Sequence, residues 1–401
     1  MTLALIADLE RNLAAREAAG LKRIRRTQVS IEGVRVVVDG DALLCFASND
    51  YLGLAHHPDV VAAARKGAAR WGAGATSSHL ICGHSTPHEA LEAELADFVR
   101  PCDGARALAF SSGYLANLAL LTTLAGRGDA IFADRLNHAC LNDGALLSRA
   151  EFVRYPHSDL AALRRRLEMS TAKRKLIATD AVFSMDGDLA PLPALAALAD
   201  EFDAWLVVDD AHGFGVLGTG ERAGAGTLAH FGLRSQRIVS MGTLGKAAGV
   251  AGAFVTAHPA VIETLIQHAR SYIFTTAPPP LLAEALRASI RIIREDAKRR
   301  THLIALIAHF RMRMGALPWR LLDSQTAIQP VVVGANSAAV ELAEALWKCG
   351  FWVPAIRPPT VPKGTARLRV TLTAAHSLAD VDALADAFAD LAPKFARTGL
   401  L

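Results

Sequence analysis

Between residues 70 and 255, short apolar β-rich runs alternate with stretches that have helical periodicity. Continuous apolar strands separated by helices are typical of a mostly parallel sheet that is covered on both faces. The predicted strands are 105–110, 129–133, 152–155, 176–180, 205–209, 238–241 and 252–255. We therefore expect an α/β domain built on a mostly parallel seven-stranded sheet flanked by helices.

The first fifty residues predict a separate arm. Apolar residues recur at helical spacing from Leu3 to Leu13 with acidic residues between them, which predicts an amphipathic helix and not a signal peptide. Residues 29–38 then alternate apolar and polar side chains, and a turn follows at 40–41. This pattern predicts one β-hairpin that ends near Phe46.

A proline triplet at 278–280 interrupts the α/β pattern. Beyond it, amphipathic helices are predicted at 281–315, 337–349 and 378–391, and strands at 327–333 and 367–373. These elements predict a smaller α+β domain. The expected division is an N-terminal arm, a large cofactor-binding domain and a C-terminal small domain, over residues 1–50, 51–280 and 281–401.

The composition is that of an ordered globular protein, with 52% hydrophobic and 20% charged residues among 401. The net charge of +4 is mild, and the short basic runs at 164–166 and 298–300 are typical of solvated helix faces. We expect no nucleic-acid partner. No apolar run approaches the roughly 20 residues that a membrane span needs, so we expect no membrane partner either.

The cysteines stand at positions 45, 82, 102, 140 and 349 and form no C-x-x-C pair. Because the set is also odd in number, neither a zinc site nor a disulfide framework is indicated, and we expect no metal. Free thiols fit a reducing compartment. The expected location is the cytoplasm.

Polar residues follow five of the seven predicted strands, at 111–114, 137–138, 183–188, 209–213 and 242–246. In open α/β sheets, ligands bind beyond the carboxyl ends of the strands. We therefore expect these five segments to converge on one crevice.

Lys246 lies in the last of these segments, within a glycine-rich turn between two apolar runs. A lysine amine in apolar surroundings loses its proton more readily, and the free amine can condense with a carbonyl. A solvated loop lysine is the ordinary alternative for any single lysine. The dense glycines favour the first interpretation because they let the backbone approach a ligand closely.

The segment 112–114 opens a predicted helix, and the N–H groups and dipole of a helix start suit a phosphate. A plain serine N-cap is the alternative there. Thr243 could add a phosphate contact beside Lys246.

Asp209 ends an apolar strand, so its carboxylate needs a cation or hydrogen-bond donors, which a protonated pyridine nitrogen would supply. The alternative is a helix-capping aspartate. His138 could stack on an aromatic ring, although a lone histidine is more often a core residue. His212 and Ser184 could hydrogen-bond a phenolic oxygen.

Together these parts make up a pyridoxal phosphate site. A Rossmann site would need G-x-G-x-x-G after an early strand, and a P-loop would need G-x-x-x-x-G-K; neither is present. The segments 48–53, 111–117, 134–139, 183–188, 208–213 and 242–246 resemble those of the α-oxoamine synthases. These are fold-type I pyridoxal phosphate enzymes that join an amino acid to an acyl thioester with loss of carbon dioxide.

The resemblance implies a role for each cofactor residue. Lys246 would be the Schiff-base lysine, Asp209 would keep the ring nitrogen protonated, and His138 would stack on the ring. The resemblance also places Gly113, Tyr114 and Thr243 at the phosphate and Ser184 and His212 at the phenolic oxygen. Cys140 stands where serine is more usual in the family, and we expect it only to pack.

The resemblance also implies substrate-binding residues. Arg369 would pair with the carboxylate of the amino acid, which suits a bidentate guanidinium. Asn49 would bind substrate, and Arg23 and Thr360 would touch the acyl substrate. The neighbours of Arg23 leave its assignment open, since Lys22, Arg25 and Arg26 are equally basic.

Segments 355–362 and 366–376 resemble the biotin-pathway branch of this family. That branch implies L-alanine and a pimeloyl thioester, carried by coenzyme A or acyl carrier protein, as substrates of a homodimer. Glycine-using members, which make 2-amino-3-ketobutyrate or 5-aminolevulinate, remain an alternative, as does serine palmitoyltransferase. A pyridoxal phosphate sensor or docking module without turnover is the non-enzymatic alternative.

Overall fold

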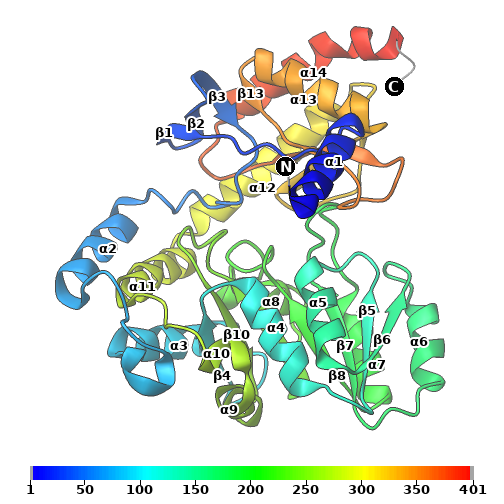
Figure 1. Cartoon of the computed structure of the whole chain (residues 1–401). Coiled ribbons are helices and arrows are strands. Elements are labelled where there is room, and N and C mark those ends of the chain that lie inside the picture. The colour runs from blue at the N-terminus through cyan, green and yellow to red at the C-terminus, as the bar shows by residue number, and fades with distance from the viewer. Residues whose placement is uncertain (1–2, 398–401) are drawn as a thin grey trace. The chain divides into compact units, whose positions relative to one another are not determined.

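The computed structural model describes residues 3–397 and divides the chain into two compact units (Figure 1). The large unit comprises residues 49–184 and 188–301. The second unit comprises the residues up to 48, residues 185–187 and those from 302 onward. The division into 1–50, 51–280 and 281–401 stays a prediction.

The large unit is built on a seven-stranded sheet in the order β4-β10-β9-β8-β7-β5-β6. β10 pairs antiparallel with both of its neighbours, and the pairs from β9 to β6 are all parallel. The predicted fold class and all seven strands are thereby confirmed. The strands are β4 (Arg106–Phe110), β5 (Ala130–Asp134), β6 (Glu151–Tyr155), β7 (Lys175–Asp180), β8 (Ala204–Asp209), β9 (Ile238–Thr243) and β10 (Ala253–Ala257).

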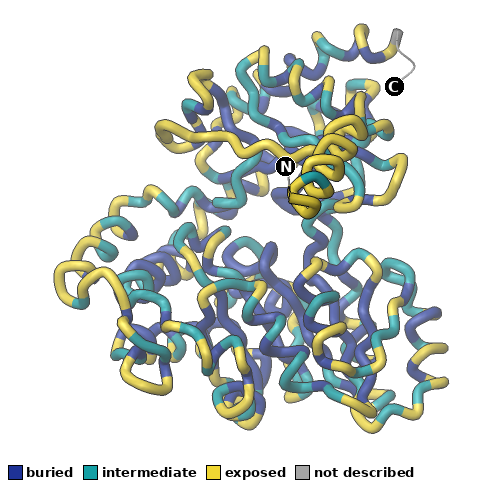
Figure 2. The backbone as a smooth tube through the Cα atoms, in the orientation of Figure 1, coloured by how far each residue is buried: buried dark blue, intermediate teal, exposed yellow. Residues whose placement is uncertain are grey.

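Helices cover both faces of this sheet because successive strand residues point to opposite sides. Val207 belongs to the apolar cluster that contains helices α4, α5, α9 and α10, whereas Leu206 and Val208 belong to the cluster with α6 and α7. Figure 2 shows most of the sheet strands as buried, and the edge strand β6 is the one that is largely exposed or half-buried. These helices are α4 (Gly113–Leu124), α5 (Ala139–Ser148), α6 (Leu160–Glu168), α7 (Leu192–Glu201), α9 (Pro259–His268) and α10 (Arg270–Ile273).

Two of the remaining helices of the large unit also contact this sheet, since α3 packs against β4 and β10, and Leu228 of α8 belongs to the cluster with α6 and α7. Pro58 occupies the first position of α2, where the missing N–H of proline costs no hydrogen bond. α11 packs against both α2 and α3. The helices are α2 (Pro58–Trp71), α3 (Thr86–Val99), α8 (Thr227–His230) and α11 (Pro280–Glu295), and α12 (Ala297–Gly315) runs from this unit into the second.

The second unit contains two four-stranded sheets, in the orders β1-β2-β3-β13 and β11-β12-β15-β14. Its helices α1, α13 and α14 lie at Ala4–Ala18, Asn336–Lys348 and Leu378–Arg397, as the sequence predicts. The strands are β1 (Gln28–Glu32), β2 (Arg35–Val38), β3 (Asp41–Cys45), β11 (Arg320–Leu321), β12 (Ile328–Gly334), β13 (Phe351–Trp352), β14 (Ala355–Ile356) and β15 (Ala366–Thr371).

The predicted single hairpin, with residues 29–38 as its first strand and its end near Phe46, is wrong in one respect. The segment forms two strands, β1 and β2, so that with β3 the arm is a three-stranded meander. The chain reverses at Gly33, whose φ of 60° is accessible to glycine at little cost. The alternating apolar pattern runs across this turn and hides it.

Two further features of the structure concern membrane-spanning helices and the state of the cysteines. Within residues 3–397, no helix combines the length and the apolar character needed to cross a membrane. All five cysteines are free thiols, and Cys45, Cys102 and Cys140 are buried.

Candidate active site

One cavity of about 200 Å³ in the large unit lies at the carboxyl ends of the sheet strands. All eight residues predicted to bind the cofactor line it. They are Gly113, Tyr114, His138, Ser184, Asp209, His212, Thr243 and Lys246. The cavity is also lined by four residues that the sequence did not single out as binding residues, namely Cys140, Asp180, Ala211 and Met241.

Asp209 is the last residue of β8 and is buried. Its Oδ2 accepts a hydrogen bond from Asn117 Nδ2 at 2.6 Å, and its Oδ1 accepts one from Ala211 N at 3.0 Å. These donors offset part of the cost of burying a carboxylate. Asn117 was missed in the sequence, although it is the single polar residue in the apolar run 115–121.

Asp180 is a second buried carboxyl group and lies directly beside Asp209 in the register of β7 and β8. Burial and the charge of Asp209 raise the pKa of Asp180 well above its ordinary value. Its Oδ2 accepts a hydrogen bond from His138 N at 3.0 Å, and its Oδ1 has no partner among the described residues. Burial beside a second carboxyl group therefore favours the protonated form of Asp180.

His138 caps the N-terminus of α5, with its Nδ1 accepting a hydrogen bond from Cys140 N at 3.2 Å. Burial lowers the pKa of His138, against the opposing effect of Asp209, so the ring is neutral near pH 7. The Sγ atom of Cys140 lies 2.8 Å from the same Nδ1. The expectation that Cys140 only packs is therefore incomplete, because its thiol also hydrogen-bonds.

Lys246 lies in the turn after β9, and its Nζ is 2.9 Å from His212 Nε2. The Nδ1 of the same imidazole is 2.5 Å from the hydroxyl oxygen of Tyr51. Tyr51 belongs to the segment 48–53 but was not among the predicted site residues. The imidazole thus connects the lysine amine to a phenol from a distant part of the chain.

The turn that carries Lys246 is held in place by a close backbone contact. Gly249 has a φ of 69°, and a Cβ atom there would lie 2.4 Å from Ala55 N. Any larger residue would collide with this backbone. The buried hydroxyl of Ser289 also donates to Ala248 O at 2.7 Å.

The start of α4 has the serine N-cap that was the alternative to a phosphate site, and it also has N–H groups that could bind a phosphate. Ser112 is an N-cap, since its Oγ accepts a hydrogen bond from Leu115 N at 3.3 Å. The first N–H groups of a helix have no acceptor within the helix, so Gly113 and Tyr114 present donors at the cavity. The Tyr114 phenol donates to Asp143 Oδ2 at 2.5 Å.

The substrate-binding residues predicted from the sequence do not line this cavity. Asn49 belongs to the large unit, whereas Arg23, Thr360 and Arg369 belong to the second unit. Arg23 and Thr360 are exposed, and Arg369 is buried, with its Nη1 donating to Thr371 Oγ1 at 2.9 Å.

The basic segment around Arg23 is partly ion-paired. Lys22 lies 2.8 Å from Glu17, and Arg26 lies 3.1 Å from Asp39. In each pair, the basic side chain already binds a carboxylate of this chain, which would compete with an anionic substrate. Arg23 is therefore a better candidate than Lys22 or Arg26.

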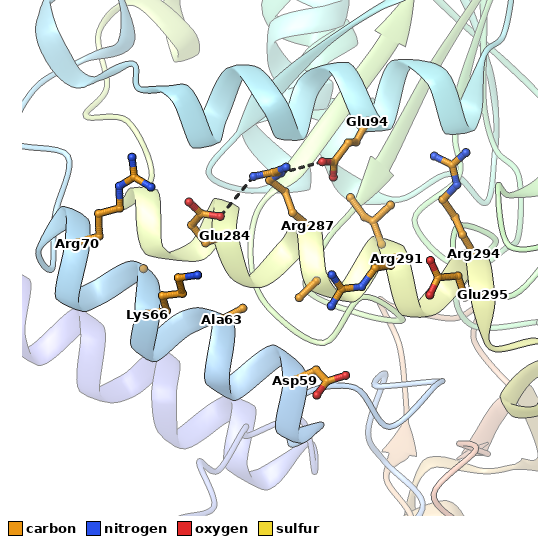
Figure 3. Close-up of a pocket in the computed structure, with 13 residues that line it drawn as sticks. Asp59, Ala63, Lys66, Arg70, Glu94, Glu284, Arg287, Arg291, Arg294 and Glu295 are labelled. Atoms are coloured by element: carbon orange, nitrogen blue, oxygen red, sulfur yellow. Dashed lines mark hydrogen bonds and ion pairs between the residues drawn. The ribbon is translucent and has the colours of Figure 1, made fainter.

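A larger hollow of about 790 Å³ lies between helices α2, α3 and α11 (Figure 3). Its charged side chains carry both signs, and Arg287 donates to Glu94 at 2.8 Å and to Glu284 at 3.4 Å. None of its carboxylates is buried. The hollow therefore offers no buried acid for a ring nitrogen.

Three histidines outside the cavity, His79, His84 and His88, place ring nitrogens within 4.8 Å of one another. Hydrogen bonds already engage both nitrogens of His88, because Nε2 donates to Pro278 O at 2.8 Å and Nδ1 accepts from Ser85 N at 3.1 Å. A metal ion bound to His88 would break one of these bonds. We therefore assign this cluster a structural role.

The donor set of the 200 Å³ cavity fits pyridoxal phosphate. A lysine amine matches its aldehyde, a buried carboxylate matches its ring nitrogen, and a helix N-terminus matches its phosphate. These three features follow the ends of different strands, and all of them line the cavity.

The comparisons agree with this fit. The class I and II aminotransferase family matches residues 42–388. The 8-amino-7-oxononanoate synthase of Aromatoleum aromaticum is 57% identical over 383 residues, which cover 96% of this chain and 98% of that protein.

Two solved structures are also similar. A serine palmitoyltransferase from S. paucimobilis with PLP and myriocin bound has a TM-score of 0.91, 29% identity and full coverage of both chains. The 8-amino-7-oxononanoate synthase of Francisella tularensis has a TM-score of 0.76 and 30% identity over 88% of this chain and 99% of that chain. The cofactor is pyridoxal phosphate. The chain belongs to the class I and II aminotransferases and, among them, to the 8-amino-7-oxononanoate synthases.

Proposed function

We propose that this protein condenses L-alanine with a pimeloyl thioester. The products are 8-amino-7-oxononanoate, carbon dioxide and the free thiol of the carrier, in biotin biosynthesis. The observation that carries this proposal is the convergence of Lys246, Asp209 and His138 on one cavity.

Pyridoxal phosphate, when bound, supplies an electron sink that stabilises negative charge at the α-carbon of the amino acid. Lys246 would hold the cofactor through its amine, and the same amine, when free, would remove the α-proton of L-alanine. His212 lies 2.9 Å from Nζ and orients that amine. Asp209 would keep the ring nitrogen protonated, which would strengthen the withdrawal of electrons.

The other cavity residues position the cofactor. Ser184 and His212 would hydrogen-bond its phenolic oxygen, and His138 would lie against its ring. Backbone N–H groups of Gly113 and Tyr114, with the hydroxyl of Thr243, would hold the phosphate. To bind the phosphate, the Thr243 hydroxyl would redirect its one hydrogen, which it donates to Gly252 O at 3.2 Å.

The substrate contacts are also part of this proposal. Arg369 would bind the carboxylate of L-alanine, Asn49 would bind substrate, and Arg23 and Thr360 would contact the acyl chain. The carrier of the pimeloyl group is either acyl carrier protein or coenzyme A. We propose a cytoplasmic location, which the five free thiols support.

A homodimer is a further part of the proposal. An isolated antiparallel bridge places Ser78 beside Thr276. The segment after Ser78 therefore lies next to the segment before Thr276. Ile81 and Phe274 on these segments are 78% and 69% exposed. Large exposed apolar side chains of this kind are typical of surfaces that bind another protein.

A substrate panel tests the proposed reaction. Purified protein loaded with pyridoxal phosphate is incubated with L-alanine, glycine or L-serine against acetyl, succinyl, pimeloyl and palmitoyl thioesters, and product masses are read. We expect 8-amino-7-oxononanoate from L-alanine and the pimeloyl thioester as the main product. A dominant glycine or serine product would instead assign the chain to a sister activity, and no product from any pair would favour a binding module.

Replacing Arg369 tests its assignment. Arg369→Ala is expected to raise the KM for L-alanine about 10- to 100-fold, because a charge-assisted hydrogen bond contributes about 1.5–3 kcal/mol. The KM for the thioester should change by less than about twofold on the same reasoning, since the thioester does not use this contact. Steady-state kinetics with each substrate varied provides the comparison, with the exposed Arg320→Ala in the same unit as control. Equal changes in both KM values would remove Arg369 from the carboxylate.

A further inference from the structure

The thiol of Cys140 is part of a buried hydrogen-bond chain that the proposed mechanism does not use. Asn117 Nδ2 donates to Cys140 Sγ at 3.1 Å and to Asp209 Oδ2 at 2.6 Å. Cys140 and Asn117 are 2% and 0% exposed. Because the amide is a donor, the sulfur accepts from it, and the hydrogen of the thiol remains to be donated elsewhere.

The backbone N–H of Leu141 also donates to this sulfur. The acceptor that the structure places against the sulfur is His138 Nδ1, at 2.8 Å. The same nitrogen faces the backbone N–H of Cys140 at 3.2 Å. Two donors directed at one nitrogen require a lone pair on it. The hydrogen of the neutral imidazole therefore lies on Nε2.

Both groups keep the protonation states that this arrangement needs. Burial and the charge of Asp209 raise the pKa of the Cys140 thiol to about 12, so the S–H hydrogen is present near pH 7. Burial lowers the pKa of His138. The backbone of His138 is also fixed, since its N–H donates to Asp180 Oδ2 at 3.0 Å.

We infer that the Cys140 thiol is a positioning group that, together with the backbone N–H of the same residue, holds His138 as the neutral Nε2–H tautomer, and that Asn117 joins this group to Asp209. A neutral imidazole is the form needed next to a protonated pyridine ring, because an imidazolium there would add a second positive charge. The role in the reaction rests on the proposed function, whereas the tautomer is a property of the chain itself.

Nitrogen-15 NMR of histidine-labelled protein tests this inference in both the cofactor-free and the cofactor-loaded protein. The His138 signals are assigned by their loss in His138→Gln. We expect an unprotonated Nδ1 and a protonated Nε2 in the wild type and in Cys140→Ser, which keeps a hydrogen-bond donor. In Cys140→Ala the backbone N–H of residue 140 remains as a donor to Nδ1. We therefore expect a partial shift of the Nδ1 signal towards the protonated form, with kcat falling about fivefold, the loss typical of one neutral hydrogen bond.

An unchanged His138 spectrum in a folded Cys140→Ala protein would overturn the inference. Infrared spectroscopy gives a second measurement that does not depend on the folding of that variant. The S–H stretching band of Cys140, assigned by its loss in Cys140→Ser, should lie at the low frequency of a donating thiol and should rise in His138→Gln. A band at the frequency of a non-donating thiol in the wild type would overturn the inference as well. If the substrate panel gave no 8-amino-7-oxononanoate, the NMR and infrared results would not change. The proposed reaction and the proposed tautomer of His138 can therefore be refuted independently.

Discussion

Replacing Lys246 with alanine is expected to abolish covalent attachment of the cofactor and to lower kcat by at least about 10³-fold, since general base catalysis alone contributes 10²- to 10⁴-fold. Lys246 has two tasks in the proposed mechanism, and alanine can perform neither. Borohydride reduction followed by peptide mass spectrometry measures the first task. The wild-type peptide that contains Lys246 should gain the mass of the reduced cofactor, and the variant peptide should not.

Lys66→Ala is a suitable control because Lys66 is an exposed lysine on α2, in the same unit but outside the 200 Å³ cavity. We expect full activity and normal cofactor attachment in this variant. Circular dichroism should also show that Lys246→Ala is folded, because its side chain lines a cavity rather than the apolar core. Full turnover in a folded Lys246→Ala protein would refute the assignment of Lys246.

The strands, and the positions of the cofactor residues at the strand ends, could be predicted because both depend on the local pattern of apolar and polar residues in the sequence. Buried parallel strands appear as continuous apolar runs, and the polar residues that follow them meet at one edge of the sheet. His138, Asp209 and Lys246 each follow such a run, so their convergence did not require knowledge of any contact. The turn at Gly33 was missed because the alternating pattern continues across it.

The partners of these residues could not be predicted, because they come from distant parts of the chain. Asn117 is 92 residues from Asp209, and Tyr51 is 161 residues from His212. Side-chain packing alone decides which polar atoms meet. Cys140 is close to His138 in sequence, but only the 2.8 Å approach of Sγ to Nδ1 reveals that it is more than a packing residue.

Asp209→Asn is expected to lower kcat about 10²- to 10³-fold, the effect of removing one partner from a buried pair of charges. The variant has nearly the shape of the wild type but no negative charge to hold the ring nitrogen protonated. The fold should tolerate the change because Asn117 Oδ1 is buried without a partner among the described residues. A flip of the Asn117 amide presents this oxygen to the new NH₂ group and restores the hydrogen bond.

Asp210, the next residue, provides the matched control. Its Oδ2 accepts from Thr227 N at 2.6 Å, and the Thr227 hydroxyl donates to its Oδ1, so its role is structural. We expect Asp210→Asn to destabilise the fold by about 1 kcal/mol with little change in kcat, because its amide oxygen can still accept from Thr227 N and its NH₂ group can donate to the Thr227 hydroxyl, but both bonds lose the charge of the carboxylate. Thermal unfolding and steady-state kinetics of both variants separate the two roles. An Asp209→Asn protein that loses stability but keeps its kcat would show that Asp209 supports the fold and not the ring nitrogen.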